Sequence, residues 1–296
     1  MVKKLLVCLL LFSFSYGDET EKIDKKDLLT QKIKSLVDTK VFVRYKSYID
    51  IIFSQKEDYF TNDGRVDSVK VIQTLKENGI LNLFFKKPCE VNISFKTEGT
   101  PLFFVKIMSD TLRNIGYYRY VTEESNLKNL EFTWKINLTS EYAADPLILS
   151  KELNKSGCKI VDVIRESATN WTYIIDMKNA RLNTKILEED VELKLKRSLY
   201  SYWLDVSKIK KLQISSSYRN NWYPYIAYYD KSLNLLRVIK RDAKRRRITL
   251  DMKENTHYVK ISDIYTLKNI KDALILIPIG TREESIKKPI QEQTQE

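Results

Sequence analysis

DPLILSKELNKSGCKIVDVI, residues 145–164, contains one complete helix-to-strand unit and is the stretch from which the fold can be inferred. Asp145 and Pro146 suit the start of a helix, because the carboxylate caps free backbone N–H groups and a proline at the first position loses no hydrogen bond. Leu153 and Gly157 mark the last turn, since glycine readily adopts the left-handed conformation that ends many helices. The run that follows, KIVDVI (159–164), has the pattern of a strand.

The same Leu-x-x-x-Gly signature occurs twice more, at residues 75–79 and 112–116, each time before a strand-like run. Asp67-Ser68 and Thr100-Pro101 supply the matching helix starts. The helix start and the glycine are 11, 15 and 11 positions apart, so the long copy differs by about one helical turn. The repeat therefore predicts three helices with structural caps at Gly79, Gly116 and Gly157.

Strand candidates separate these helices and give the order α-β-β-α-β-β-α-β-β from residue 67. They are 80–85, 91–96, 117–122, 130–138, 159–164 and 171–176, with VFVRY (41–45) as an added first strand. Read from Val91, the order β-α-β-β-α-β resembles the split βαβ arrangement of ferredoxin-like domains. Residues 65–177 are also similar to the small βαββ modules of periplasmic secretin N-domains and POTRA domains, which implies a scaffold and not an enzyme.

The C-terminal half has the pattern of an antiparallel β-sandwich, with short strands separated by turn residues. The expected strands are 212–218, 223–230, 235–240, 246–252, 257–265 and 273–279. The runs Ile226–Asp230, Leu235-Leu236 and Tyr258–Ile261 are similar to the bacterial pre-peptidase C-terminal β-sandwich, which implies a module that binds or positions other components. The fold class predicted for the chain is thus α+β: repeated βαβ, ferredoxin-like units followed by an antiparallel β-sandwich.

The predicted organisation has six segments, the first of which is a signal peptide. Lys3 and Lys4 precede an apolar run of about 12 residues and a small-residue site that ends at Gly17. A membrane anchor would need about 20 apolar residues. The segments are 1–17 signal peptide, 18–64 helical or extended segment, 65–177 repeated α/β domain, 178–200 connector, 201–280 β-sandwich and 281–296 disordered tail.

An exported chain of this charge is suited to anionic partners. The formal net charge is +12, and cleavage after Gly17 removes two lysines and no acid, which leaves +10. We therefore expect a periplasmic protein that does not span the membrane once the signal is cleaved. Its expected partners are envelope proteins, with anionic wall polymer or lipid headgroups as further candidates, and no nucleic acid.

An aromatic cluster at the start of one predicted strand is the first recognition candidate. In a strand, Trp222, Ile226 and Tyr228 share one face and Tyr223, Tyr225 and Tyr229 share the other. If the first set is core, the second forms an outward tyrosine strip that suits a sugar or a protein partner. Two alternatives remain, namely that both faces are buried or that the tyrosines shield a flat sheet. The candidate contact residues are Trp222, Tyr223, Tyr225 and Tyr229.

A basic run directly follows and is the candidate contact for an anionic surface. It carries seven positive side chains and one negative, a net +6 of the mature +10. The alternative is a solvated hairpin turn between two strands, and the export signal argues against a nucleic-acid role. The seven are Arg237, Lys240, Arg241, Lys244, Arg245, Arg246 and Arg247.

Two pairs of residues are candidates for covalent modification. Cys89 and Cys158 are a candidate disulfide in an oxidising compartment. In a ferredoxin-like sheet, however, they would lie at opposite ends of neighbouring strands, about 20 Å apart, so the disulfide and that register cannot both be right. Asn92 and Asn154 each fit an acidic glycosylation sequon, although both lie in predicted helices or strands where a sugar would not fit.

No catalytic motif accompanies this architecture. The chain has one histidine, His257, and no nucleophile elbow, Ser-x-x-Lys pair or phosphate-binding glycine loop, so we expect no catalytic residue, metal or cofactor. The prediction is an exported, non-enzymatic structural or assembly component of the bacterial envelope that acts through protein–protein contacts. The alternatives are a cell-wall or glycan-binding module and a hydrolase with dispersed carboxylates.

Overall fold

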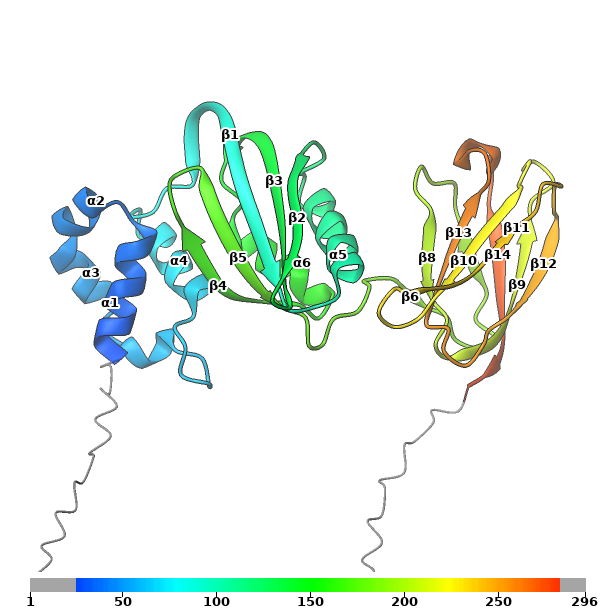
Figure 1. The fold of residues 1–296 in the computed structure, drawn as a ribbon, viewed down its shortest axis with the longest axis horizontal. Coiled ribbons are helices and arrows are strands. Elements are labelled where there is room, and N and C mark those ends of the chain that lie inside the picture. The colour runs from blue at the N-terminus through cyan, green and yellow to red at the C-terminus, as the bar shows by residue number, and fades with distance from the viewer. Residues whose placement is uncertain (1–24, 283–296) are drawn as a thin grey trace, which may run out of the picture. The chain divides into compact units, whose positions relative to one another are not determined.

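The computed structural model describes residues 25–282 and divides the chain into two compact units, Met1–Val66 and Asp67–Glu296 (Figure 1). The predicted signal peptide lies outside the described residues, as does most of the predicted tail. Within the described range no helix is both long and apolar enough to cross a bilayer.

The described part of the first unit is helical. Its elements are α1 (Lys25–Leu36), α2 (Thr39–Arg44), α3 (Lys46–Ile52) and the 3-10 helix η1 (Lys56–Tyr59). The strand predicted at 41–45 is wrong, because most of that run lies in α2. Phe42 is buried whereas its neighbour Val43 is 69% exposed, and Phe42, Ile49 and Phe53 recur at the spacing of a buried helical face. This packing overrides the strand propensity of the valines.

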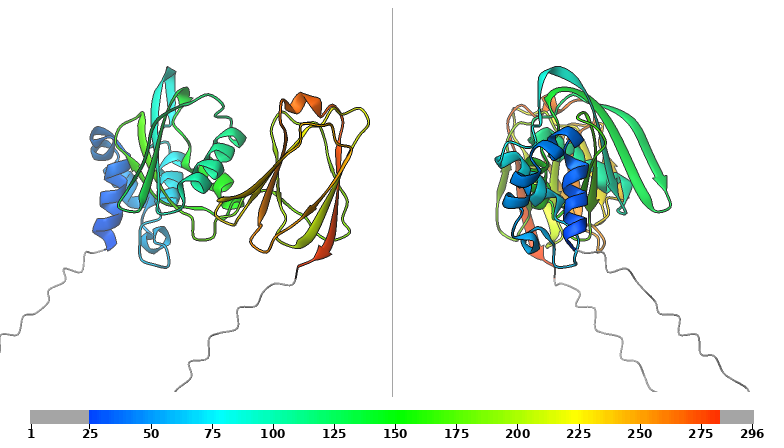
Figure 2. Two further views of the ribbon diagram at one scale, coloured as in Figure 1. Left: turned by 45° about the vertical axis from the view of Figure 1, so that its right-hand side comes forward. Right: turned by 90° about the vertical axis from the view of Figure 1, so that its left-hand side faces the viewer.

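The second unit begins with an α/β lobe, in which three helices accompany a five-stranded sheet of order β2-β3-β1-β5-β4. The helices α5 and α6 lie against one face of this sheet (Figures 1 and 2). The elements are α4 (Ser68–Glu77), β1 (Phe84–Thr97), α5 (Pro101–Asn114), β2 (Val121–Lys128), β3 (Glu131–Tyr142), α6 (Pro146–Lys155), β4 (Lys159–Arg165) and β5 (Asn170–Asp176).

The three Leu-x-x-x-Gly copies are confirmed as three helix ends of one type. After α6, the Gly157 N–H donates to the Asn154 carbonyl at 3.0 Å and the Cys158 N–H donates to the Leu153 carbonyl at 3.2 Å. This pair of bonds defines the Schellman motif, and the same pair closes α4 and α5. The leucine of each signature occupies the same position in the motif and is fully buried. All three glycines have a positive φ: 69° for Gly79, 100° for Gly116 and 68° for Gly157.

The sheet departs from the predicted ferredoxin-like order in two ways. The end of the first expected strand, 84–85, and the whole of the second, 91–96, belong to one strand, β1, whose pairing with β3 is irregular between Phe84 and Cys89. Residues 80–83 precede β1 and are not part of a strand, although Ile80, Leu81 and Leu83 are buried. In addition, β5 lies between β1 and β4 and pairs with β1 in parallel, so β1 and β4 are not neighbours.

The rest of the second unit is sandwich-like, with two mainly antiparallel sheets. One sheet has the order β11-β10-β13-β8-β6 and the other has the order β12-β9-β14-β7. The strands are β6 (Lys185–Ile186), β7 (Leu193–Leu195), β8 (Tyr202–Asp205), β9 (Ile209–Ser216), β10 (Pro224–Tyr229), β11 (Leu235–Lys240), β12 (Arg247–Asp251), β13 (Tyr258–Asp263) and β14 (Leu274–Thr281), with the 3-10 helix η2 (Leu267–Asn269) between the last two. The α+β class is therefore confirmed.

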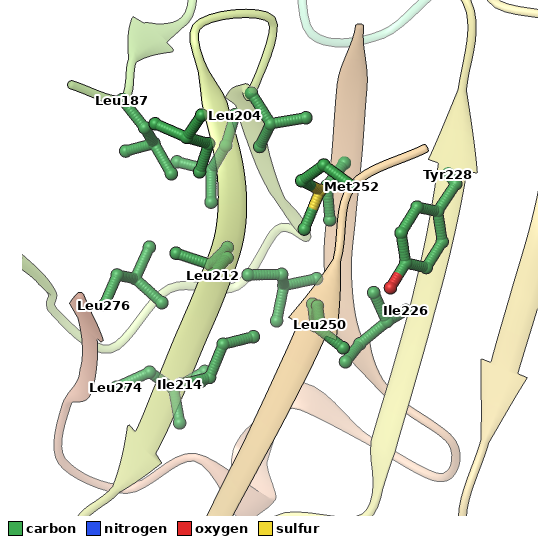
Figure 3. Packing of buried hydrophobic residues seen from close by; sticks show 14 of the residues in the cluster. Leu187, Leu204, Leu212, Ile214, Ile226, Tyr228, Leu250, Met252, Leu274 and Leu276 are labelled. Atoms are coloured by element: carbon green, nitrogen blue, oxygen red, sulfur yellow. The ribbon is translucent and has the colours of Figure 1, made fainter. Parts of the chain in front are cut away.

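The core of this lobe lies between its two sheets. Figure 3 shows Leu212, Leu250 and Ile226 gathered in the same space, although the first two belong to one sheet and the third to the other. Trp222 and Tyr228 complete this core, with exposures of 0% and 2%.

The lobe also extends beyond its predicted limits at both ends. The predicted connector, 178–200, contributes the strands β6 and β7 and the core residue Leu187. At the other end, β14 continues to Thr281, past the predicted boundary at residue 280.

Candidate functional site

The basic run is a crossover between the two sheets of the sandwich, and we call residues 237–247 the basic crossover. The alternative given for this run, a hairpin turn between two paired strands, is wrong, because β11 pairs with β10 in one sheet whereas β12 pairs with β9 in the other. The physical reason is burial: Leu250 of β12 is 1% exposed in the core, which it reaches from the opposite sheet. Two strands that follow one another in the sequence need not pair with each other when each pairs with a different strand.

The backbone of the basic crossover is held at three points. The N–H groups of Arg241 and Arg245 donate to the carbonyls of Pro224 and Trp222, both at 3.1 Å. The Ser216 N–H donates to the Arg246 carbonyl at 2.8 Å. The loop is thus tied to both sheets.

All seven predicted cations of this segment are exposed. Within the described part of the chain none of them forms an ion pair with a carboxylate. The segment therefore presents concentrated positive charge on a fixed backbone.

Strand β11, which leads into the basic crossover, lies at the edge of its sheet. It pairs with β10 alone, so one of its sides carries no neighbouring strand in the described structure. Leu235 and Leu236 are 57% and 45% exposed there. Exposed leucines on an edge strand therefore lie next to cations that form no ion pair with a carboxylate among the described residues.

The aromatic cluster divides between the two faces of β10 in the alternation that the sequence predicts. Trp222 is fully buried in the core and its indole N–H donates to the Ser262 carbonyl at 2.8 Å. Its candidacy as a contact residue is therefore wrong. Tyr223, Tyr225 and Tyr229 are half-buried on the other face.

These three tyrosines are packed against neighbours of their own sheet and the segment that follows it. The Lys240 Nζ lies 5.5 Å from the centre of the Tyr225 ring, and the Tyr229 ring lies 5.0 Å from Trp203. Tyr223 contacts Tyr265 edge to face at 5.1 Å. The tyrosine face thus combines aromatic rings with lysines instead of forming an open platform of free rings.

The single histidine belongs to a structural carboxylate network. Asp205 accepts hydrogen bonds from the Ser207 hydroxyl at 2.6 Å and the Ser207 N–H at 2.9 Å, and His257 Nε2 lies 3.4 Å from its other oxygen. In a catalytic triad the histidine lies between the carboxylate and the serine. Here the carboxylate lies between the other two, so His257 does not activate Ser207.

This network predicts a specific acid sensitivity. Burial opposes ionisation of Asp205, but hydrogen bonds from His257 and Ser207 outweigh it and lower the pKa of this carboxyl from 3.8. Its contribution is therefore present above the unfolded pKa and is lost as the pH falls through the folded pKa. We expect Asp205→Asn to cost about 1.5–3 kcal/mol at pH 6, and we expect the difference from wild type to shrink below pH 4. Urea unfolding at pH 6 and below pH 4 measures the loss of stability in the variant. Asp251→Asn, which changes an exposed carboxylate, is the control and should show no loss of stability that depends on pH in this way.

Both cysteines are free thiols, so the candidate disulfide is not formed. Cys89 lies near the irregular end of β1, where its sulfur is 3.9 Å from the Ser140 carbonyl oxygen, whereas Cys158 is buried just before β4. Burial, with a further effect from Asp176, raises the pKa of the Cys158 thiol to about 12. The register used to question the disulfide is also wrong, because β5 separates β1 from β4.

The two glycosylation candidates lie in different surroundings. Asn92 is half-buried in the middle of a ladder of amides across three strands, where it donates to Asn170 at 3.0 Å and accepts from Asn137 at 2.9 Å. Attachment of a sugar would break this ladder. Asn154 is exposed on the last turn of α6.

One group of polar residues was missed by the sequence analysis because its members come from distant segments. Lys106, Asp110 and Arg113 of α5 meet Trp203 of β8 and Lys260 of β13 around a cavity of about 320 Å³. The spacing of the three charged residues on α5 was the only local signal, since it places both cations one turn from the same carboxylate.

No family model, curated protein or solved structure matches this chain. The similarities to secretin N-domains, POTRA domains and the pre-peptidase C-terminal sandwich therefore stay predictions from the sequence. Among residues 25–282, no group of three or more histidine, cysteine, aspartate or glutamate side chains is placed to hold a metal ion.

Proposed function

We propose that this protein is an exported, non-enzymatic assembly component of a bacterial envelope that acts in the periplasm by docking on an acidic protein partner. The docking surface is the basic crossover together with the edge of strand β11. The export assignment rests on the N-terminal sequence, and the docking assignment rests on the surface chemistry of the sandwich.

The observation that carries the proposal is the seven exposed cations on a backbone held at three points. A backbone that is already held loses little further conformational entropy on binding, and the exposed charges contribute to partner choice and to the rate of association. Leu235 and Leu236 add exposed apolar area beside these charges. An edge strand with leucines and cations suits an extended acidic polypeptide better than a purely polar polymer.

Charge reversal tests this proposal in the intact exported protein. We expect the Arg245→Glu, Arg246→Glu, Arg247→Glu triple variant to lose the partners that wild type retains by crosslinking in an envelope fraction. We also expect wild-type retention to weaken about tenfold or more from 0.05 to 0.5 M salt, because the attraction is electrostatic.

The matched control reverses three exposed cations of the α/β lobe, Lys86, Lys87 and Arg119, which changes the net charge by the same amount. Equal retention of partners by wild type and both triple variants would contradict docking through the basic crossover. Loss of retention in Tyr225→Ala, Tyr229→Ala alone would favour the glycan-binding alternative.

A further inference from the structure

The cavity beside α5 is a second candidate site, separate from the basic crossover. It has a volume of about 320 Å³ and lies within the second unit, between α5 and strands β8 and β13. Residues 182–184 and 200–201 complete its wall. This volume is at the lower end of the range for small-molecule sites.

The cavity carries an excess of two positive charges. The Asp110 carboxylate pairs with Lys106 through one oxygen and with Arg113 through the other, so both of its oxygens are occupied by cations. Lys260 is the third cation of the wall and forms no ion pair with a carboxylate of residues 27–282. One carboxylate therefore faces three cations.

Aromatic rings hold these cations in place. The centre of the Trp203 ring lies 5.1 Å from Lys106 Nζ and 5.7 Å from Lys260 Nζ. Two lysines from different elements therefore contact one ring. The Arg113 guanidinium lies 4.7 Å from the centre of the Tyr200 ring. Contacts of this kind attract cations to the ring face and limit the positions that the long side chains adopt.

The grouping is unfavourable for the cations when the cavity holds no anion. Burial lowers the pKa of Lys106; Asp110 opposes this effect, whereas Arg113 and Lys260 add to it. An anion in the cavity would offset this repulsion, and a dianion would match the excess charge. A phosphoryl group carries a charge of about −1.5 to −2 at neutral pH and offers several acceptor oxygens to Lys and Arg donors.

We propose that this cavity binds a phosphate dianion, either free or as the phosphoryl group of a small phosphomonoester. A water molecule takes about 30 Å³ of liquid volume, so the cavity of about 320 Å³ has room for about ten. It is therefore larger than one phosphate needs. The remaining space, lined by Asn183, Thr184 and Ser201, accommodates the polar organic part of an ester or ordered water.

Titration calorimetry of the intact mature protein, with inorganic phosphate and glucose 6-phosphate as separate probes, tests the proposal. We expect saturable binding of at least one probe, and Lys260→Gln should weaken it about tenfold or more, because it removes a charged donor. Tighter binding of glucose 6-phosphate would identify an ester as the ligand, and equal binding would identify the phosphoryl group alone. Arg113→Gln should weaken binding in the same direction.

Lys240→Gln is the matched control, because Lys240 also lies over an aromatic ring but does not line the cavity. It should leave phosphate binding within about twofold of wild type, as should the triple variant of the basic crossover, which separates this proposal from the proposed function. No saturable binding of either probe would overturn the proposal. So would equal binding of acetate, or binding that Lys260→Gln leaves unchanged.

Discussion

Gly157→Ala is expected to destabilise the α/β lobe far more than the same change at Gly79 or Gly116. All three glycines end a helix with a positive φ, and a residue with a Cβ costs about 1–2 kcal/mol in that conformation. At Gly79 and Gly116 a Cβ would meet no atom within 4 Å, so this cost is the whole effect. At Gly157 the Cβ would clash with the backbone carbonyl oxygen of Asn179.

That oxygen cannot move freely, because it belongs to a backbone segment tied to the same helix end. The Arg181 N–H donates to the Ser156 carbonyl at 2.9 Å, one residue before the glycine. We therefore expect Gly157→Ala to cost about 3 kcal/mol or more, the sum of the conformational cost and the displacement of packed backbone. Urea unfolding of the three single variants measures the contrast. Three equal losses of stability would contradict the role assigned to Asn179.

Trp222→Ala is the second change with a large expected effect, and it acts in the other lobe. The indole is fully buried between the sheets, and its loss leaves a large cavity and removes the hydrogen bond to the Ser262 carbonyl. Large-to-small changes of this size cost about 3–5 kcal/mol. Thermal and urea unfolding of the variant measures the loss. Trp203→Ala, at a half-buried ring outside the core, should cost clearly less.

Tyr228→Phe is the matched control within the same core. The Tyr228 hydroxyl is buried and has no hydrogen-bond partner among residues 25–282, and burial raises its pKa to about 12. Its removal should leave stability unchanged or raise it by up to about 1 kcal/mol, because a buried polar group without a partner is unfavourable. A large loss of stability in Tyr228→Phe, or a small one in Trp222→Ala, would show that this core is packed differently.

The local signals in the sequence were reliable wherever a short stretch determines its own conformation. The three helix ends depend on a leucine and a glycine four positions apart, and all three were predicted. Trp222 lies on one face of its strand and Tyr223 and Tyr225 lie on the other. This placement follows from the two-residue period of a strand and was predicted for the same reason.

The missed features depend on contacts between segments, such as which strands pair, and no local pattern encodes those contacts. Pro88, after two lysines, has the pattern of a turn, yet it lies within β1, where the pairing with β3 is irregular and a proline is tolerated. The basic run looks like a hairpin because both of its flanks are strands. The cavity was missed because Lys260 lies about 150 positions from Lys106 in the sequence and the two lysines meet only over the Trp203 ring.

The basic crossover also bears on self-association. It joins β11 and β12, each of which lies at one edge of its sheet, and such edges are where copies of a β-sheet protein most readily pair with one another. Two copies brought together along these edges would bring two basic crossovers close together, each with seven exposed cations. The repulsion between these cations disfavours pairing of two copies along this edge. The same edge would accept an acidic partner.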